Sequence, residues 1–382
     1  MSITLPVSIG EAIDKLSILD IKCSFIKDSR RDECQKEYDA LLPMLKQHID
    51  KFPFQYRMLK TINEDIWTMQ DAFRECSNVK TCIDIIQKND MRFRIKNNLN
   101  VLTSSVLKEQ KGYTPKSAVF IGHLGIGDHM GLIGAVRYIS LDWDTLYVVC
   151  KAKYFKNIQR MYDDTPNIQC VPVQNDYHYP ELNNLSYSKV FKSGIFHDVH
   201  REFTNLPNQF YEDLGLDPEI QHKYFWISPP KFSLELPVPY IFVHQSASNT
   251  TIPLITWDIN ERLTIDPNTN LYPEGHPWYN IANTCVDMLV ADYTTIIINA
   301  SEVHVLDSSF YCLARYLPLT ARVKVCYNRE TGKPSEAYTF KENITGSRLV
   351  IRKASKTTRS QSCRDCLENL DRHEEMVSHS KP

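Results

Sequence analysis

The sequence predicts an α/β protein that begins with an all-helical segment. The 382-residue chain has no glycine between Gly10 and Gly112, and apolar residues in that stretch recur at steps of three and four. From residue 117 onward, short β-branched runs alternate with helix-like segments, which is the pattern of a parallel sheet. Two of these strands run into small polar loops followed by a helix, within 118–139 and 303–317.

Length and composition narrow the class of protein. A chain of 382 residues exceeds the usual size of a single core, so we expect more than one domain. The net charge of −2 gives no general attraction to nucleic acid. No run of 18 apolar residues occurs, and no basic segment precedes an apolar one at the N-terminus. We therefore expect a cytoplasmic protein without a transmembrane segment.

Residues 1–113 are expected to form a helical hairpin or small bundle. Ser8 and Glu11 have the spacing of a capping box, so a helix should start there. A second helix is expected from about Arg31 to Leu45, with Pro53 beyond its end. Three later groups of apolar residues predict further helices, within 59–73, 83–86 and 93–102.

Several short stretches within residues 1–113 resemble a known domain. Val7-Ser8-Ile9-Gly10-Glu11, Asp14 to Leu19, Asn89-Asp90 and the stretch 109–113 resemble an uncharacterised bacterial domain often found near glycan-synthesis genes. The resemblance implies no chemistry. Its charged residues are expected on solvated faces and in ion pairs between helices.

Residues 114–230 are expected to form a first α/β domain. Strands are predicted at 118–121, 146–150, 168–173 and 187–196, and a helix at 206–214 that Gly215 stops. Gly122, Gly125 and Gly127 lie in the loop after the first strand, and Asp128 lies where the next helix begins. In open α/β sheets, ligands bind at this edge.

Three interpretations of this loop stay open on spacing alone. Asp128 can be a plain helix N-cap. A dinucleotide site is the second, although the glycine order differs from Gly-x-Gly-x-x-Gly. The third is a sugar-transfer site, in which Gly125 and Gly127 admit the acceptor and Asp128 takes its proton.

A resemblance favours the third interpretation. Gly125-Ile126-Gly127-Asp128, followed by an apolar helix ending in Ala135-Val136-Arg137, resembles the opening of the lipopolysaccharide heptosyltransferases and related GT-B glycosyltransferases. The resemblance covers about residues 117–330. It implies a pair of Rossmann-type domains, Asp128 as the catalytic base and inversion at the anomeric carbon. His129 and His123 flank Asp128 and are the alternative bases.

Residues 231–353 are expected to form the second domain. The strand 240–243 leads into His244, Gln245, Ser246 and Ser248. This resembles the GT-B loop His-x-Gly-x-Ser, which faces the donor phosphates. Ser246 stands where that motif has glycine, and the Lys-x-Trp-Pro of the heptosyltransferases is absent, so the resemblance does not identify heptose as the sugar.

A second polar loop follows the predicted strand 303–306. Asp307, Ser308 and Ser309 precede a helix expected over 310–317, and resemble the GT-B element that cradles the donor diphosphate. A plain cap is the alternative. His276, before a helix expected over 279–289, completes the predicted donor-binding set. Further strands are predicted at 263–266, 322–326 and 348–351, and residues 354–382 are expected to be a disordered tail.

Two possible metal sites are weak. Asp142-Trp143-Asp144 has the Asp-x-Asp form of the other large glycosyltransferase fold, but it precedes its strand. Four residues of the tail have irregular zinc-like spacing, namely Cys363, Cys366, His373 and His379. We therefore predict no metal and no cofactor besides the nucleotide-sugar donor.

The sequence thus predicts a metal-independent, inverting glycosyltransferase. Its expected partners are a nucleotide-sugar and a glycan or glycolipid acceptor, with no nucleic acid. Two alternatives are a catalytically inactive GT-B protein that binds glycans or acts as a scaffold, and a nucleotide-dependent enzyme outside glycosyl transfer.

Overall fold

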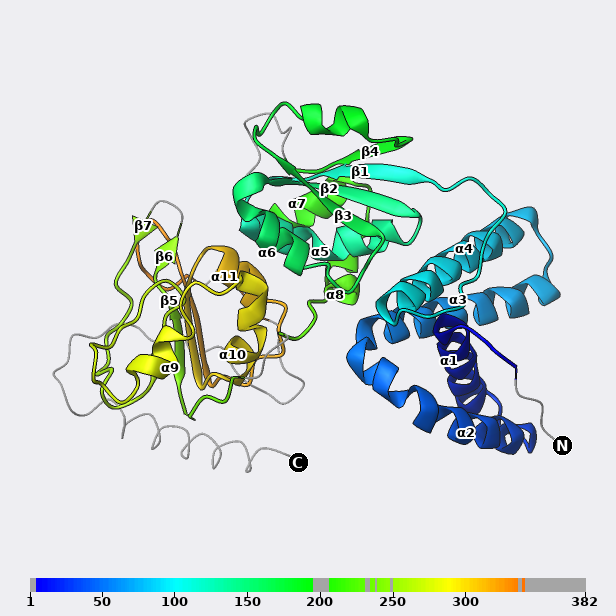
Figure 1. Cartoon of the computed structure of the whole chain (residues 1–382), viewed down its shortest axis with the longest axis horizontal. Coiled ribbons are helices and arrows are strands. Elements are labelled where there is room, and N and C mark those ends of the chain that lie inside the picture. Colours follow the sequence, from blue (N-terminus) through cyan, green and yellow to red (C-terminus); the bar gives the residue numbers. More distant parts are fainter. Residues whose placement is uncertain are drawn as a thin grey trace, which may run out of the picture. The chain divides into compact units, whose positions relative to one another are not determined.

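The computed structural model describes residues 5–194, 206–230, 234–237, 239–247, 250–335 and 339–340. Every described residue belongs to one compact unit of the chain. This unit contains an N-terminal helical region and two parallel sheets with helices (Figure 1). Several predictions lie outside the described residues: Ser248, the strand 348–351, and the tail 354–382 with its zinc-like residues. The domain boundaries at 113, 230 and 353 stay predictions.

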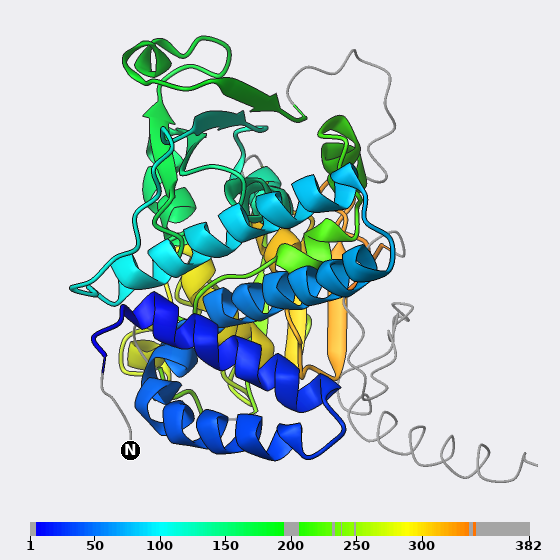
Figure 2. The same ribbon diagram turned by 90° about the vertical axis from the view of Figure 1, so that its right-hand side faces the viewer.

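Four helices make the N-terminal region, and Figure 2 shows them in blue and cyan. They are α1 (Ile9–Phe25), α2 (Arg30–Lys51), α3 (Pro53–Glu75) and α4 (Val79–Leu102). The predicted cap is confirmed, because the Glu11 N–H donates to Ser8 Oγ at 3.1 Å. The Glu11 carboxylate does not return to the cap and instead pairs with Lys96.

The predicted end of the second helix was too early. α2 continues to Lys51 with Pro43 inside it, and Pro53 opens the next helix. Proline suits that place, since the first-turn N–H groups of a helix have no partner within it. The last two apolar groups, at 83–86 and 93–102, belong to the single helix α4.

The first sheet has four parallel strands in the order β3-β2-β1-β4. They are β1 (Ser117–Ile121), β2 (Thr145–Lys151), β3 (Ile168–Val173) and β4 (Lys189–Lys192). Figure 1 shows α5 (Ile126–Ser140) and α6 (Phe155–Arg160) on the same face of this sheet. α7 (Leu206–Asp213) ends before Gly215, whose φ of +65° confirms the predicted stop, and α8 (Ile220–Tyr224) follows.

The second sheet is also parallel, in the order β10-β9-β5-β8. Its strands are β5 (Ile241–His244), β8 (Thr264–Ile265), β9 (Glu302–Leu306) and β10 (Val323–Tyr327). The short strands β6 (Ser246–Ala247) and β7 (Thr250–Thr251) pair antiparallel beside it.

Helices of the second sheet region are shorter than predicted. α9 (Tyr279–Asn283) stops before 289, and Asp287 turns away with a φ of +57° as its N–H donates to Pro267 O. α11 (Ser309–Ala314) stops before 317, since Pro318 disfavours helical backbone in the residue before it. The sequence analysis also missed α10 (Thr294–Asn299).

Each sheet has one point where the strand order reverses. In the first sheet, β1 lies between β2 and β4, and in the second, β5 lies between β8 and β9. Ligands of open α/β sheets bind in the crevice outside the carboxyl ends of the strands at such a point. The three loops singled out from the sequence, which follow β1, β5 and β9, therefore lie at the two reversal points.

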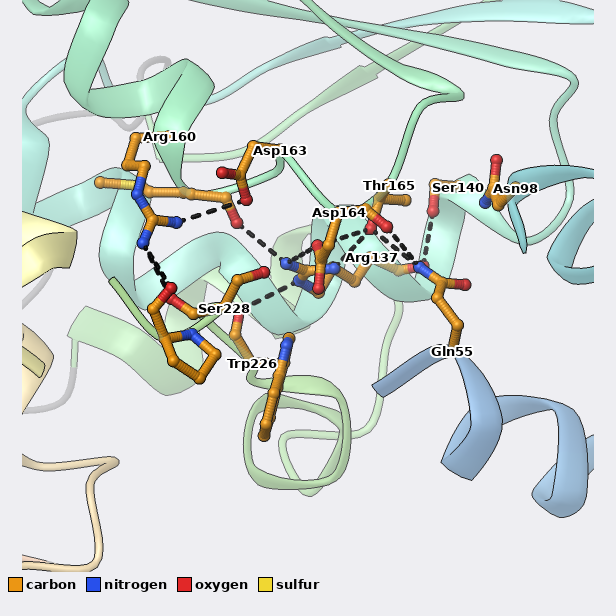
Figure 3. A network of polar contacts seen from close by, with 12 residues as sticks. Gln55, Asn98, Arg137, Ser140, Arg160, Asp163, Asp164, Thr165, Trp226 and Ser228 are labelled. Carbon is orange, nitrogen blue, oxygen red and sulfur yellow. Dashed lines mark hydrogen bonds and ion pairs between the residues drawn. The ribbon is translucent and has the colours of Figure 1, made fainter. Parts of the chain in front are cut away.

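Arg137 of α5 joins the helical region to the first sheet region (Figure 3). Its side chain is fully buried and pairs with Asp164 at 2.7 Å. The guanidinium also donates to the main-chain oxygens of Met161 and Trp226 and to Thr165 Oγ1. Phe54 of α3 lies 4.5 Å from it, measured to the ring centroid.

No helix in the described part of the chain is long and apolar enough to cross a membrane.

Replacing Arg137 should destabilise the protein strongly. In Arg137→Met the Asp164 carboxylate stays buried without its cation, which costs about 3–5 kcal/mol. Urea unfolding followed by circular dichroism measures the change. Arg74→Met is the matched control, because the Arg74 pair with Asp71 is exposed to solvent. Equal midpoints for the two variants would contradict the structural role given to Arg137.

Candidate functional site

The loop after β1 places a carboxylate against an imidazole. The N-cap of α5 is Gly125, and Asp128 is the third residue of the helix, so the alternative interpretation of Asp128 as a plain N-cap is wrong. Asp128 Oδ2 instead hydrogen-bonds His123 Nδ1. A Cβ on Gly125 would lie 2.5 Å from Asp128 Oδ2. A side chain at residue 125 would therefore displace the Asp128 carboxylate from its position against His123.

The hydrogen bond between Asp128 and His123 changes the pKa of the imidazole. The Asp128 carboxylate raises the pKa of His123, against an opposing effect of burial. The side chain of His123 is 56% exposed and that of Asp128 is 22% exposed, so solvent reaches both groups. With Nδ1 directed at a carboxylate, Nε2 is the ring nitrogen left to face a ligand.

His129, the other predicted catalytic residue, is fully buried. Burial lowers its pKa to about 4, so the ring is neutral near pH 7. Neither ring nitrogen has a hydrogen-bond partner among the described residues. A general base must reach the proton that it removes, so this placement favours the Asp128–His123 pair over His129.

The loops after β5 and β9 meet at His244 and Ser308. Ser308 Oγ lies 3.1 Å from His244 Nδ1 and also donates to Leu306 O. The His244 ring packs on Phe310, with the centroids 4.5 Å apart. Burial lowers the pKa of His244 to about 4, so it holds Ser308 as a neutral ring.

Three further residues predicted to bind the donor, Gln245, Ser246 and His276, make contacts with their own neighbouring segments. Gln245 is engaged at both ends, since it donates to Asp266 and accepts from Leu254 N–H. Ser246 lies in β6, and its hydroxyl accepts from Thr251. His276 stacks on Tyr272, with the ring centroids 4.6 Å apart, and its Nδ1 accepts from Trp278 N–H. Gln245 thus positions its loop through its own contacts.

Contacts bring the two polar loops together. A Cβ on Gly127 would lie 3.4 Å from Cys312 Sγ and 3.5 Å from the main chain of Ser309, so α5 and α11 pack through this glycine. Asp128 and Asp307 both raise the pKa of Cys312, which burial brings to about 12. The charges of both carboxylates therefore act on this thiol. The structure brings Asp128, Ser309 and Asp307 into one neighbourhood.

Two basic residues of this neighbourhood were missed. Arg315 and Arg329 lower the pKa of Cys312, which means that their charges act close to it. Arg329 follows β10 in a turn held by Asn328, whose side chain accepts from Glu330 and Thr331 N–H groups. No local pattern marks Arg329, because it follows β10, which pairs with β9 and so carries the chain back beside the strand that precedes Asp307.

The Asp-x-Asp motif has a structural use. Asp144 accepts from Arg94 Nε at 3.0 Å and from Lys116 N–H at 2.8 Å, which ties α4 to the first sheet region. Across the described ranges, no group of three His, Cys, Asp or Glu side chains is arranged to hold a metal ion.

A family of unknown function, DUF6165, matches residues 3–123. The match spans the four front helices and β1 and reaches His123. No curated protein matches the sequence.

Two solved structures resemble the chain weakly. One is the iron-containing dodecameric glycosyltransferase TibC from enterotoxigenic E. coli H10407, with 13% identity and a TM-score of 0.36 over 58% of this chain and 61% of that one. The other is the heptosyltransferase TibC in complex with ADP-D-beta-D-heptose, with 14% identity and a TM-score of 0.35 over 59% and 62%. The chain spans about three fifths of each, and a similarity of this size does not establish a shared activity.

The pKa of His123 should depend on Asp128. In Asp128→Asn the carboxylate acceptor is gone, so the pKa of His123 should fall toward its ordinary value of 6.5. Gly125→Ala should shift it in the same direction, since the added Cβ displaces the same carboxylate. An NMR titration of the imidazole signals measures both shifts, with His48 of α2 as internal control. An unchanged His123 curve in both variants would show that the bond does not form in solution.

Proposed function

We propose that this chain is a GT-B-type glycosyltransferase that moves a sugar from a nucleotide-sugar to a glycan or glycolipid hydroxyl. The observation that carries the proposal is the meeting of two polar loops, each at the reversal point of its own parallel sheet, through Gly127 and Ser309. One loop offers a base, and the other offers hydroxyl and main-chain N–H groups. The likeness of both loops to GT-B motifs supports the same assignment.

Donor binding is assigned to the second sheet region. The set comprises the residues predicted from the sequence, namely His244, Gln245, Ser246, Ser248, His276, Asp307, Ser308 and Ser309. The main-chain N–H groups around Ser308, whose side chain is held by neutral His244 and by Leu306 O, suit diphosphate oxygens. Arg329, whose charge acts on Cys312 as that of Asp307 does, adds a positive charge. We propose that these groups replace a divalent metal in balancing the charge of the leaving diphosphate.

Proton removal is assigned to Asp128. The acceptor oxygen forms a bond to the anomeric carbon as the bond to the nucleoside diphosphate breaks, and the acceptor proton passes to the Asp128 carboxylate. Attack from the face opposite the leaving group inverts the anomeric carbon. Gly125 leaves room for the Asp128 carboxylate and Gly127 lets α5 pack on α11, so neither glycine is assigned to acceptor entry. The alternative acceptor of the proton is Nε2 of His123, with Asp128 stabilising the imidazolium that forms.

Asp128→Asn should reduce turnover by about 10²–10⁴-fold with little change in donor affinity. Transfer is measured with UDP-, GDP-, ADP- and dTDP-sugars in the presence of EDTA, which also tests the absence of a metal requirement. His123→Gln distinguishes the two bases, since only a proton acceptor role for His123 predicts a comparable loss. Normal turnover in Asp128→Asn would remove Asp128 from catalysis, and activity that needs added Mn²⁺ would remove the metal-free mechanism.

Changing both serines of the second loop to leucine should weaken nucleotide binding. Each charge-assisted hydrogen bond contributes roughly 1.5–3 kcal/mol, so blocking the loop predicts a loss of roughly tenfold or more in affinity. Calorimetric titration with nucleoside diphosphates measures it. Ser301→Leu, just before the start of β9 at the opposite edge of the sheet, is the control. Equal affinities in the Ser308→Leu, Ser309→Leu double variant and in the control would refute this assignment.

A further inference from the structure

We propose that residues 174–182, named here the tyrosine loop, form a subsite for a sugar ring of the acceptor, with Tyr177 as the stacking surface. The inference rests on the proposed function and deepens it, because it names the residues that recognise the acceptor. The tyrosine loop follows β3, and none of its residues belongs to the site predicted from the sequence.

The tyrosine loop lies at the same edge of the sheet as the candidate base. β3, β2 and β1 are parallel neighbours, so their carboxyl ends meet at one edge. Leu182 shares a hydrophobic cluster with Leu124, the residue after His123, and Tyr179 packs against that cluster. Lys151 and Asp176 both influence the charge on His123. The loop is therefore packed beside the Asp128–His123 pair.

Local hydrogen bonds hold the loop in one shape. Asn175 Oδ1 accepts from the N–H groups of Tyr177 and His178, at 2.8 and 3.2 Å. Tyr179 donates its hydroxyl to Asp176 O, and the Asp176 carboxylate pairs with Lys151 at 2.7 Å. A loop tied down in this way loses little conformational freedom when a ligand binds.

Tyr177 is the one tyrosine of this loop that its own contacts leave outside the core. Its side chain is 83% exposed, whereas Tyr179 packs inward. A sugar ring combines an apolar C–H face, which suits an aromatic ring, with hydroxyls that suit charged and polar groups. Lys151 and Asp176 supply a donor and acceptors next to Tyr177. An aromatic platform with polar neighbours therefore favours a carbohydrate over a purely apolar ligand.

The test uses the full-length protein on an array of immobilised glycans. Tyr177→Ala should weaken binding to the retained glycans by roughly tenfold, since the aromatic face is lost. Tyr177→Phe keeps the ring and should stay within about threefold of the unchanged protein. Tyr187→Ala is the matched control, because Tyr187 is 38% exposed and precedes β4 at the opposite edge of the sheet. At 83% exposure, Tyr177 can be truncated without disturbing the core.

Each outcome decides the proposal. Selective loss of glycan binding in Tyr177→Ala supports the subsite. Equal binding by Tyr177→Ala and Tyr187→Ala, or no glycan bound by the unchanged protein, overturns it. Nucleoside diphosphate binding is measured separately, so that a failure of the subsite proposal can be distinguished from a failure of the proposed function. If the nucleotide binds and the glycan result is negative, the subsite fails and the proposed function stands; if no nucleotide binds, the proposed function fails by itself.

Discussion

The buried guanidinium of Arg137 is the interaction on which the arrangement of this protein depends. A charge inside a core is tolerated only with a paired anion and satisfied N–H groups, and Asp164 with three oxygen acceptors provides both. Those partners come from separate parts of the chain, including Thr165 before β3 and Trp226 after α8. Gln55 of α3 donates to the main-chain oxygen of Asp164. One side chain therefore fixes the end of α5 against the front helices.

Fixing α5 at its end also fixes the residues at its start. Asp128 lies in the first turn of the helix that carries Arg137, and Gly127 packs on Ser309. A second buried guanidinium, Arg160 of α6, donates to the main-chain oxygens of Ser228 and Pro229 and pairs with Asp292 at 2.7 Å. The candidate base is thus held by a rigid helix, and Arg160 makes a second contact between the two sheet regions. A preorganised site needs supports of this kind.

Features of this protein that depend on neighbouring residues could be predicted from the sequence, whereas features that depend on tertiary contacts could not. The glycine-rich loop, the cap at Ser8 and the stop at Gly215 follow from residues adjacent in sequence, and the structure contains all three. Sequence also marked Asp128 and Ser308, but it could not place them relative to each other. The approach of Gly127 to Ser309, which brings their loops together, depends on strand order and on the packing of α5 on α11. Arg329 was missed for the same reason, since the pairing of β10 with β9 places the residues after β10 where the charge of Arg329 acts on Cys312.

The segment matched by the family, residues 3–123, includes both the front helices and the first strand of the sheet region against which they pack. The match continues past the last front helix through β1 to His123, so the first strand and the start of its loop belong to the same matched segment as the helices. Packing gives the physical reason: Leu141 and Tyr224 of the first sheet region lie in one hydrophobic cluster with Leu59 and Ile95 of the front helices. Helices that share a core with the sheet region cannot be separated from it without exposing apolar surface. The front helices are therefore part of the same packed structure as the first sheet region.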